Sequence, residues 1–185
     1  MINEDLRKGH GVYYTPSKIV NYMCQESLIN YLENEFEGKI NRLEFESLIK
    51  HGEYVITKTD AKQIDDKLAN IRVCDPAVGA GAFLISMMLE IVKARNVLTN
   101  YLSEINNRTI YNFKRHCIKN CLYGVDIDSS VVYITKLRLW LSLVSNEKDI
   151  TILKSLPNLD YKLICGNSLI GIERSLFNNH LFKLL

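Results

Sequence analysis

Three short segments of this sequence combine acidic or amide side chains with glycine in a pattern that could bind a small molecule. Asp75 begins the run Asp-Pro-Ala-Val-Gly-Ala-Gly, and Asp126 follows the run Leu-Tyr-Gly-Val. Asn167 lies in a third run, Gly-Asn-Ser-Leu. Glycines let a backbone approach a ligand closely and can open a helix N-terminus. An acid directly before them suits a cationic or amino-bearing ligand, and the absence of a third glycine disfavours conventional dinucleotide binding.

Each of these runs follows a short apolar segment that is typical of a buried strand. The predicted strands cover residues 71–74, 121–125 and 161–165. Helical patterns of apolar residues follow the first two strands, and this alternation predicts an α/β protein with a parallel sheet and crossover helices. Ligands of such sheets bind outside the carboxyl ends of the strands. We therefore expect the three polar turns to face one crevice.

Further helices are predicted on both sides of the first turn. Apolar residues recur at helical spacing over 16–35, and the Thr-Pro pair at its start predicts Thr15 as the N-cap. A helix after Asp128 is apolar on most faces, so we expect it to be almost fully buried, Trp140 included. Residues 37–70 are more charged and predict two short helices or an irregular insertion.

Length and composition restrict the class of protein. The chain has 185 residues, 47% of them hydrophobic and 24% charged, with a net charge of +2. This balance is typical of one globular domain, and the mild charge does not by itself indicate a nucleic-acid binder or a membrane anchor. No apolar run is long enough to span a membrane, so we expect no membrane partner. Five cysteines and a polar N-terminus without a signal-peptide pattern favour reduced thiols and a cytoplasmic location.

Taken together and in this order, the motifs resemble those of the amino-group DNA methyltransferases, in particular the adenine-N6 enzymes of bacterial restriction–modification systems. The resemblance is closest to the methylase subunit of type I systems and to the fused type IIG enzymes. It rests on the segments Gly11–Pro16, Asp75–Leu84, Gly124–Asp128 with the following Lys136–Trp140, and Gly166–Leu169.

The resemblance implies a partial Rossmann-like S-adenosylmethionine-dependent methyltransferase fold. We expect about three parallel strands with crossover helices, preceded by an N-terminal helical segment. In these terms residues 1–70 form the helical segment with the Tyr-Thr-Pro motif, and residues 71–185 form a truncated methyltransferase core.

The resemblance also implies a set of residues that bind S-adenosyl-L-methionine. They are Tyr14, Thr15, Asp75, Ala77, Gly79, Gly81, Asp126, Ile127 and Asn167. By this resemblance Thr15 holds the methionine carboxylate. Asp75 and the backbone of Ala77 and Gly79 hold the methionine end of the cofactor.

The remaining roles concern the adenosine part. The resemblance implies that Asp126 accepts hydrogen bonds from the ribose hydroxyls and that Ile127 packs on the adenine ring. It implies that Asn167 meets the adenine amino group, although many family members carry Asp at that place. Asp128, two residues further on, is better explained as the cap of the following helix.

The catalytic signature of the family, Asn/Asp-Pro-Pro-Tyr/Phe, is absent, since prolines stand only at positions 16, 76 and 157. We therefore expect the chain to be the cofactor-binding portion of a DNA adenine-N6 methyltransferase that flips its target base, and to be inactive alone. DNA would bind through parts of the full enzyme that are absent here. The alternatives are a non-catalytic interaction module, or one piece of a split methylase completed by another chain. A methyltransferase for a small substrate and a nicotinamide-dependent oxidoreductase are more distant alternatives.

The edge of the first strand raises a further expectation. Without a fourth strand beside it, residues 71–74 would present unpaired backbone groups. We expect this edge to be covered by residues 174–185, by a missing C-terminal part, or by a second copy in a homo-oligomer.

Two weaker signals have simpler explanations. His116, Cys117 and Cys121 suggest a zinc site by their spacing, but no fourth ligand is near and we expect no metal. Lys136 and Arg138 could contact phosphate, yet a solvated helix edge is the simpler interpretation.

Overall fold

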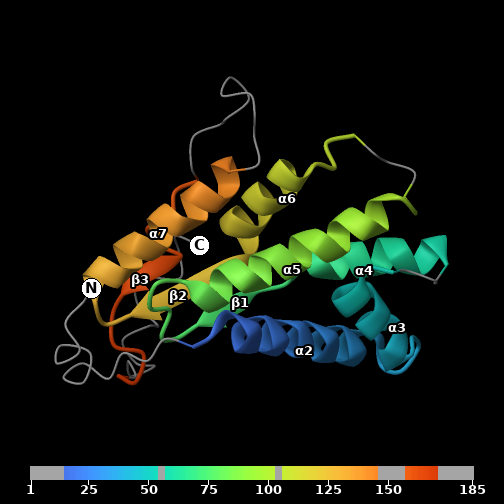
Figure 1. The fold of residues 1–185 in the computed structure, drawn as a ribbon, viewed down its shortest axis with the longest axis horizontal. Helices are drawn as coiled ribbons and strands as arrows, with labels where there is room; N and C mark the ends of the chain where they lie inside the picture. Colours follow the sequence, from blue (N-terminus) through green and yellow to red (C-terminus); the bar gives the residue numbers. More distant parts are fainter. Residues whose placement is uncertain (1–14, 54–56, 103–105, 146–156, 171–185) are drawn as a thin grey trace, which may run out of the picture.

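The computed structural model describes residues 15–53, 57–102, 106–145 and 157–170. Its centre is a parallel sheet in the order β1 (Val73–Asp75), β2 (Leu122–Asp126), β3 (Leu163–Cys165), as Figure 1 shows. Val73 pairs with Leu122, and Gly124 pairs with Leu163. The parallel strands and their helical connections confirm the predicted α/β class, although each strand begins later than predicted.

Helical segments connect the strands and cover one face of the sheet. Helix α5 (Ala82–Thr99), helix α6 (Ile110–His116) and the π-helix η2 (Cys117–Cys121) lie between β1 and β2, and α7 (Ser129–Val144) lies between β2 and β3. Right-handed crossovers that proceed in one direction across a sheet place their helices on the same face. Accordingly, α5 and α7 contact each other and both contact β2.

The other face of the sheet is only partly covered by the described residues, among them Lys162, whose ammonium lies 3.8 Å from the centre of the Tyr123 ring. Cys74, Tyr123, Val125 and Ile164 share this face, because their strands pair in register. Cys74 is exposed, Ile164 is 46% exposed, and the other two are half-buried. Parallel sheets are normally covered on both faces, so this open face is unusual for an isolated domain.

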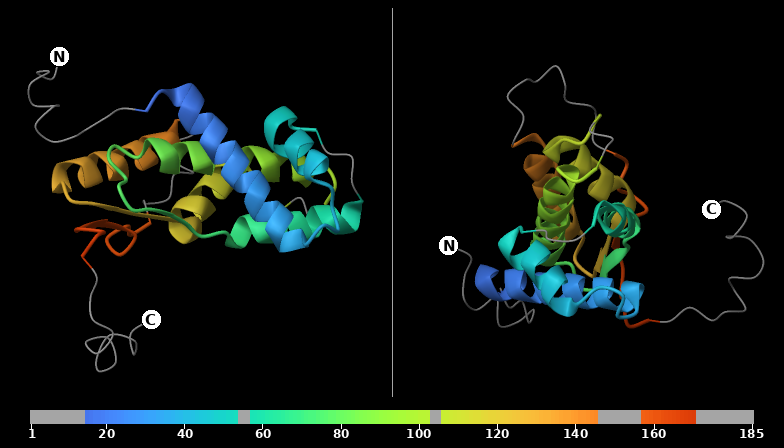
Figure 2. Two further views of the ribbon diagram at one scale, coloured as in Figure 1. Left: turned by 90° about the horizontal axis from the view of Figure 1, so that it is seen from below. Right: turned by 90° about the vertical axis from the view of Figure 1, so that its right-hand side faces the viewer.

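Helix α2 (Ser17–Phe36) crosses α5 and borders the sheet beside β1 (Figure 2). The predicted range was right to within one residue, but the predicted cap was wrong. Pro16 occupies the N-cap, without a side-chain hydrogen bond. Its extended backbone (ψ 140°) places it outside the helix, while its carbonyl accepts the Val20 N–H at 3.1 Å. Thr15 therefore lies one residue too early to cap the helix.

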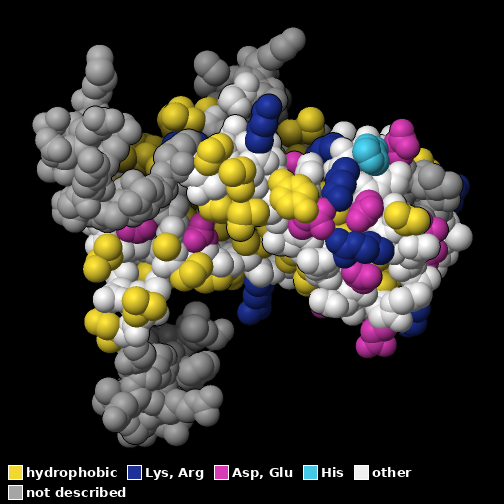
Figure 3. All heavy atoms as spheres, turned by 60° about the horizontal axis from the view of Figure 1, so that its bottom comes forward, with side chains coloured by type: hydrophobic (Ala, Val, Ile, Leu, Met, Phe, Trp, Pro, Cys, Tyr) yellow, Lys and Arg dark blue, Asp and Glu magenta, His cyan; other side chains and the backbone are white. Residues whose placement is uncertain are grey.

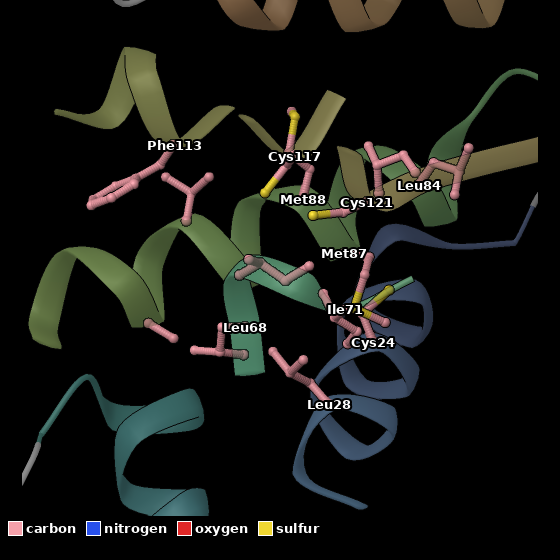
Figure 4. Close-up of a cluster of buried hydrophobic side chains, with 14 of the residues drawn as sticks. Cys24, Leu28, Leu68, Ile71, Leu84, Met87, Met88, Phe113, Cys117 and Cys121 are labelled. Carbon is pink, nitrogen blue, oxygen red and sulfur yellow. The ribbon is translucent and has the colours of Figure 1, made fainter. Parts of the chain in front are cut away.

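The charged insertion folds into α3 (Arg42–Glu46), the π-helix η1 (Ser47–His51) and α4 (Lys58–Asn70). The side chain of Asn41 caps α3 in a capping box with Glu44, and Thr57 caps α4. Side chains from α2, α4 and α5 meet in one apolar core, where Leu28, Leu68 and Met88 are fully buried (Figure 4).

A buried cluster of ion pairs connects α4 to α5 and to the segment that follows α5. Asp65 accepts hydrogen bonds from Arg95 Nε at 2.9 Å and from Arg108 Nη1 and Nη2 at 2.8 Å each. Both guanidinium groups lie over the Phe113 ring. Burial raises the pKa of Asp65, but the hydrogen bonds from Arg108 and Arg95 outweigh it and hold the pKa below its ordinary value.

Helix α7 is less buried than the sequence predicted. Its buried side chains, Val132, Thr135, Leu139 and Leu143, form one stripe. Trp140 is 43% exposed, so the prediction that it lies in the core was wrong. The buried stripe faces the rest of the described structure, whereas Ile134, Leu137, Trp140 and Leu141 on the other sides of α7 are 41–54% exposed.

Charged side chains gather over α3, η1 and the end of α2 (Figure 3). There Arg42 forms ion pairs with Glu26, Glu33 and Glu46, and Lys50 pairs with Glu26. These partly exposed pairs contribute little to stability individually. Within the described ranges, no helix is long and apolar enough to cross a membrane.

Candidate functional site

The three polar turns meet at the carboxyl ends of the strands, as predicted. The Gly79 N–H donates to Asp126 Oδ2 at 2.8 Å, which joins the first turn to the second. Ser168 Oγ donates to the Pro76 carbonyl at 2.6 Å, which joins the third turn to the first. The Gly166 N–H donates to the Asp126 carbonyl at 2.8 Å. Residues far apart in the sequence thus form one continuous rim.

Asp75, the last residue of β1, has one satisfied carboxylate oxygen and one free one. Its Oδ1 accepts the Ala77 N–H at 3.1 Å. Its Oδ2 is buried and has no hydrogen-bond partner. Burial raises the pKa of Asp75, the hydrogen bond from Ala77 opposes the rise, and the charge of Asp126 adds to it. A buried acceptor without a partner is uncommon, and a ligand with an ammonium or other N–H donor would satisfy it.

A groove of about 300 Å³ borders Asp75 along the edge of β1. Helix α2 contributes Met23 and Cys24 to its wall, β1 contributes Val73, and α5 contributes Phe83. The lining is mostly apolar, so the unpartnered oxygen of Asp75 is the charged group beside a hydrophobic surface. Such a combination is typical of ligand sites.

The two glycines of the first turn are required for different reasons. Gly79 has φ +48° and Gly81 has φ +78°, a region that L side chains rarely adopt. A Cβ at Gly81 would lie 2.7 Å from Thr135 Cγ2, whereas a Cβ at Gly79 would meet nothing within 4 Å. Gly81 thus permits close packing of α5 on α7, and Gly79 permits the turn itself.

Two side chains of α7 hold the carbonyls of this turn. Thr135 Oγ1 donates to the Gly79 carbonyl at 2.7 Å, and Arg138 Nη1 donates to the Ala80 carbonyl. The interpretation of Arg138 as a solvated helix edge was therefore wrong, while the neighbouring Lys136 donates to the exposed Asp160 at 2.9 Å. The spacing of three residues between Thr135 and Arg138, which places both on one helix face, was the available signal.

Asp126 and Asp128 have different tasks. Besides Gly79, Asp126 accepts the Asp128 N–H at 3.0 Å through Oδ1. Each carboxylate oxygen keeps a further lone pair, so Asp126 can still accept hydroxyl donors. Asp128 caps α7 and accepts the Ser130 N–H at 2.8 Å, which confirms its predicted role. Ile127, between them, is 73% exposed.

The remaining predicted residues are less closely tied to the rim. Asn167 Oδ1 accepts the Leu169 N–H at 2.9 Å within its own turn, and the side chain is exposed. Thr15 is half-buried at the start of α2. Tyr14 lies outside the described residues. His116 and Cys121, whose spacing suggested a zinc site, both form side-chain hydrogen bonds with the Ala69 carbonyl oxygen.

The fold and the rim define a class of protein. A parallel sheet with helical crossovers, an acid followed by a glycine turn after β1, and a second acid after β2 that reaches this turn characterise a partial Rossmann-like methyltransferase fold. The family model described as the MmeI DNA-methyltransferase domain matches residues 52–170. The chain belongs to this family.

Two curated relatives extend the comparison. A protein of Methanocaldococcus jannaschii, provisionally named as a type II restriction enzyme and methyltransferase, is 38% identical over 184 residues. That match covers 92% of this chain and 15% of the relative. The type II restriction enzyme and methyltransferase RM.Eco57I of Escherichia coli is 32% identical over 146 residues, 71% of this chain and 14% of the relative. The chain thus belongs to a family of DNA-methyltransferase domains, is similar to relatives named as restriction enzymes and methyltransferases, and spans a small share of their length.

Proposed function

We propose that this chain forms the S-adenosylmethionine-binding portion of a DNA adenine-N6 methyltransferase of a restriction–modification system. The observation that carries this proposal is the buried, unpartnered Oδ2 of Asp75 beside a glycine turn held to Asp126. These hydrogen-bond acceptors fit the cofactor, which carries an ammonium group on its methionine part and hydroxyl groups on its ribose.

In this proposal Asp75 binds the ammonium group, and the backbone of Ala77, Gly79 and Gly81 shapes the surface around the methionine end. Asp126 accepts the ribose hydroxyls through its remaining lone pairs. When bound, S-adenosylmethionine supplies an electrophilic methyl group. The chain's own residues contribute binding and orientation, which are the main sources of acceleration in a direct transfer between two bound groups.

The adenosine end would be held less tightly. Ile127 is exposed and available to pack on the adenine ring, and the amide of Asn167 lies on the same rim. Thr15 and Tyr14 complete the proposed set at the N-terminal motif. Their support is the family resemblance.

We propose DNA as the substrate and adenine as the target base on less direct support than the cofactor site has. The relatives carry names of restriction enzymes with methyltransferase activity, which supports DNA as the substrate. This chain has no Pro-Pro pair and therefore does not contain the catalytic signature of the family. We therefore propose that this chain alone binds cofactor without transferring methyl groups, and that a further polypeptide segment supplies the catalytic motif and the DNA contacts.

Equilibrium dialysis with tritium-labelled S-adenosylmethionine tests both parts separately. The chain should retain the cofactor with saturation at one site, and Asp75→Asn should lose most of this retention. In a parallel reaction with unmethylated plasmid DNA, no label should reach N6-methyladenine. Failure of retention would overturn the cofactor assignment, whereas transfer by the chain alone would overturn the assignment of catalysis to another segment.

A second candidate function is an interaction module, and the open sheet face favours it. Cys74 and Ile164 are exposed on this face, and β1 lies at an edge of the described sheet. Either a second copy of this chain or a polypeptide segment that completes the sheet would cover the open face and the β1 edge. The covering of the edge by residues 174–185 lies outside the described residues. The dialysis discriminates, because a pure interaction module retains no cofactor at millimolar concentration.

A further inference from the structure

Helix α7 holds the peptide planes of the glycine turn. Thr135 Oγ1 donates to the Gly79 carbonyl at 2.7 Å, and Arg138 Nη1 donates to the Ala80 carbonyl. Thr135 is completely buried, so its hydroxyl has no water to bond instead. Two consecutive carbonyls of the turn are thereby fixed by one helix.

Thr135 also fixes the turn by contact. A Cβ at Gly81 would lie 2.7 Å from Thr135 Cγ2 and 3.1 Å from Thr135 Oγ1, so the two residues are packed as closely as a glycine allows. Only a glycine at this place leaves room for the threonine, and only a threonine combines the methyl contact with the hydroxyl donor. The pair therefore acts as one unit.

Fixing a carbonyl also fixes the amide of the next residue, because a trans peptide is planar with its C=O and N–H on opposite sides. The carbonyl of Gly79 faces Thr135, so the Ala80 N–H points away from α7. Among the described residues no acceptor bonds this N–H. The Gly81 N–H is used within the turn, where it donates to the Val78 carbonyl at 2.8 Å.

We propose that Thr135 and Arg138 are positioning residues for the cofactor turn. They hold the carbonyls of Gly79 and Ala80 toward α7 and so leave the Ala80 amide available to an acceptor group of the ligand. The inference rests on the proposed S-adenosylmethionine site and adds to it two residues of α7 to which the sequence assigned no role in binding the cofactor.

Calorimetric titration of S-adenosylmethionine into the 185-residue chain and its variants tests the role. Thr135→Val keeps the shape and removes the donor, and it should raise the Kd about tenfold. Thr135→Ser keeps the hydroxyl and should bind nearly as the wild type does. Arg138→Met should weaken binding, while Lys136→Met, a cation lost from the same helix, should leave the Kd unchanged.

Amide hydrogen exchange of the cofactor-free protein gives a readout independent of binding. Thr135→Val should speed exchange at Gly81, whose bond to Val78 depends on the turn's conformation, without speeding exchange in the buried turns of α5. A merely structural Thr135 would instead lower the unfolding midpoint and speed exchange throughout, with an unchanged Kd for the folded protein.

The possible results are distinguishable. Weaker binding by Thr135→Val with rescue by Thr135→Ser supports the positioning role. Equal Kd values for the wild type, Thr135→Val and Arg138→Met overturn the positioning role. Absence of wild-type binding overturns the proposed function, and local exchange then still decides whether α7 holds the turn.

Discussion

The N–H of Gly79 donates to Asp126 Oδ2 at 2.8 Å and connects the turn after the first strand to the end of the second. The two parts of the candidate cofactor site therefore depend on each other. A change at the proposed ribose acid also disturbs the turn that shapes the methionine end.

Asp126→Ala should raise the Kd for S-adenosylmethionine more than tenfold. The substitution removes the hydroxyl acceptor and leaves the Gly79 N–H without its partner, a penalty of about 1–3 kcal/mol. Asp128→Asn is the matched control, because Asn caps a helix about as well as Asp does. Calorimetry measures both, and equal weakening by the two variants would contradict the assigned roles.

Asp75→Asn should separate binding from stability. The pKa of Asp75 is raised in the folded chain, mainly by burial. The ionised carboxylate is therefore disfavoured by folding, with a penalty that is complete above the folded pKa and absent below the unfolded one. The neutral amide should unfold at a slightly higher temperature near pH 7 while binding cofactor at least tenfold more weakly.

The same shift predicts a pH dependence of binding. As the pH falls through the raised pKa of Asp75, the carboxylate that would hold the ammonium group becomes neutral. The affinity of the wild type should therefore decrease on acidification, and that of Asp75→Asn should not follow this decrease. Parallel pH profiles for the two proteins would rule out Asp75 as the ammonium ligand.

Asp65→Ala should be strongly destabilising, because it leaves Arg95 and Arg108 buried without their shared carboxylate. The expected loss is about 3–5 kcal/mol, measured by urea unfolding. Asp66→Asn, an exposed neighbour, should stay within about 0.5 kcal/mol of wild type. A small effect of Asp65→Ala would mean that the ion cluster is not formed in solution.

The ion cluster also has a pH signature. The lowered pKa of Asp65 means that its contribution to stability is present above the unfolded pKa and is lost as the pH falls through the folded value. Wild type should thus lose stability on acidification, with a smaller loss in the Asp65→Ala variant. Unfolding midpoints measured across the acidic range check the sign.

Gly124→Ala should destabilise the contact between the glycine turn and β2. A Cβ at Gly124 would lie 2.9 Å from Val78 Cγ2 and 3.0 Å from Leu163 Cδ2. Such overpacking costs about 1–3 kcal/mol. Gly166→Ala is the control, since its Cβ would lie 3.7 Å from Val125 Cγ1, an ordinary contact. Equal unfolding midpoints for both variants would show that Val78 does not pack on β2.

Much of this arrangement could be predicted from the sequence. The strands, the glycine turn and the cap at Asp128 depend on local patterns, in which glycine, proline and acidic residues mark the ends of elements. The meeting of the three turns also follows, because parallel strands place their carboxyl ends at one edge.

What could not be predicted depends on contacts between distant segments. The bonds of Thr135 and Arg138 to the turn join residues more than 50 positions apart, and Arg138 reads locally as a surface cation. Trp140 was predicted in the core because an apolar helix suggests burial on all sides. Burial of an outer face depends on neighbours that helical periodicity does not reveal.

Amide hydrogen exchange with and without S-adenosylmethionine shows whether the three turns form one cofactor site. Bound cofactor should slow exchange in the turns at 75–81, 126–128 and 166–168 together and should leave exchange over the charged surface of α3 unchanged. Protection confined to another region, or no protection anywhere at millimolar cofactor, would contradict the assignment of one cofactor site.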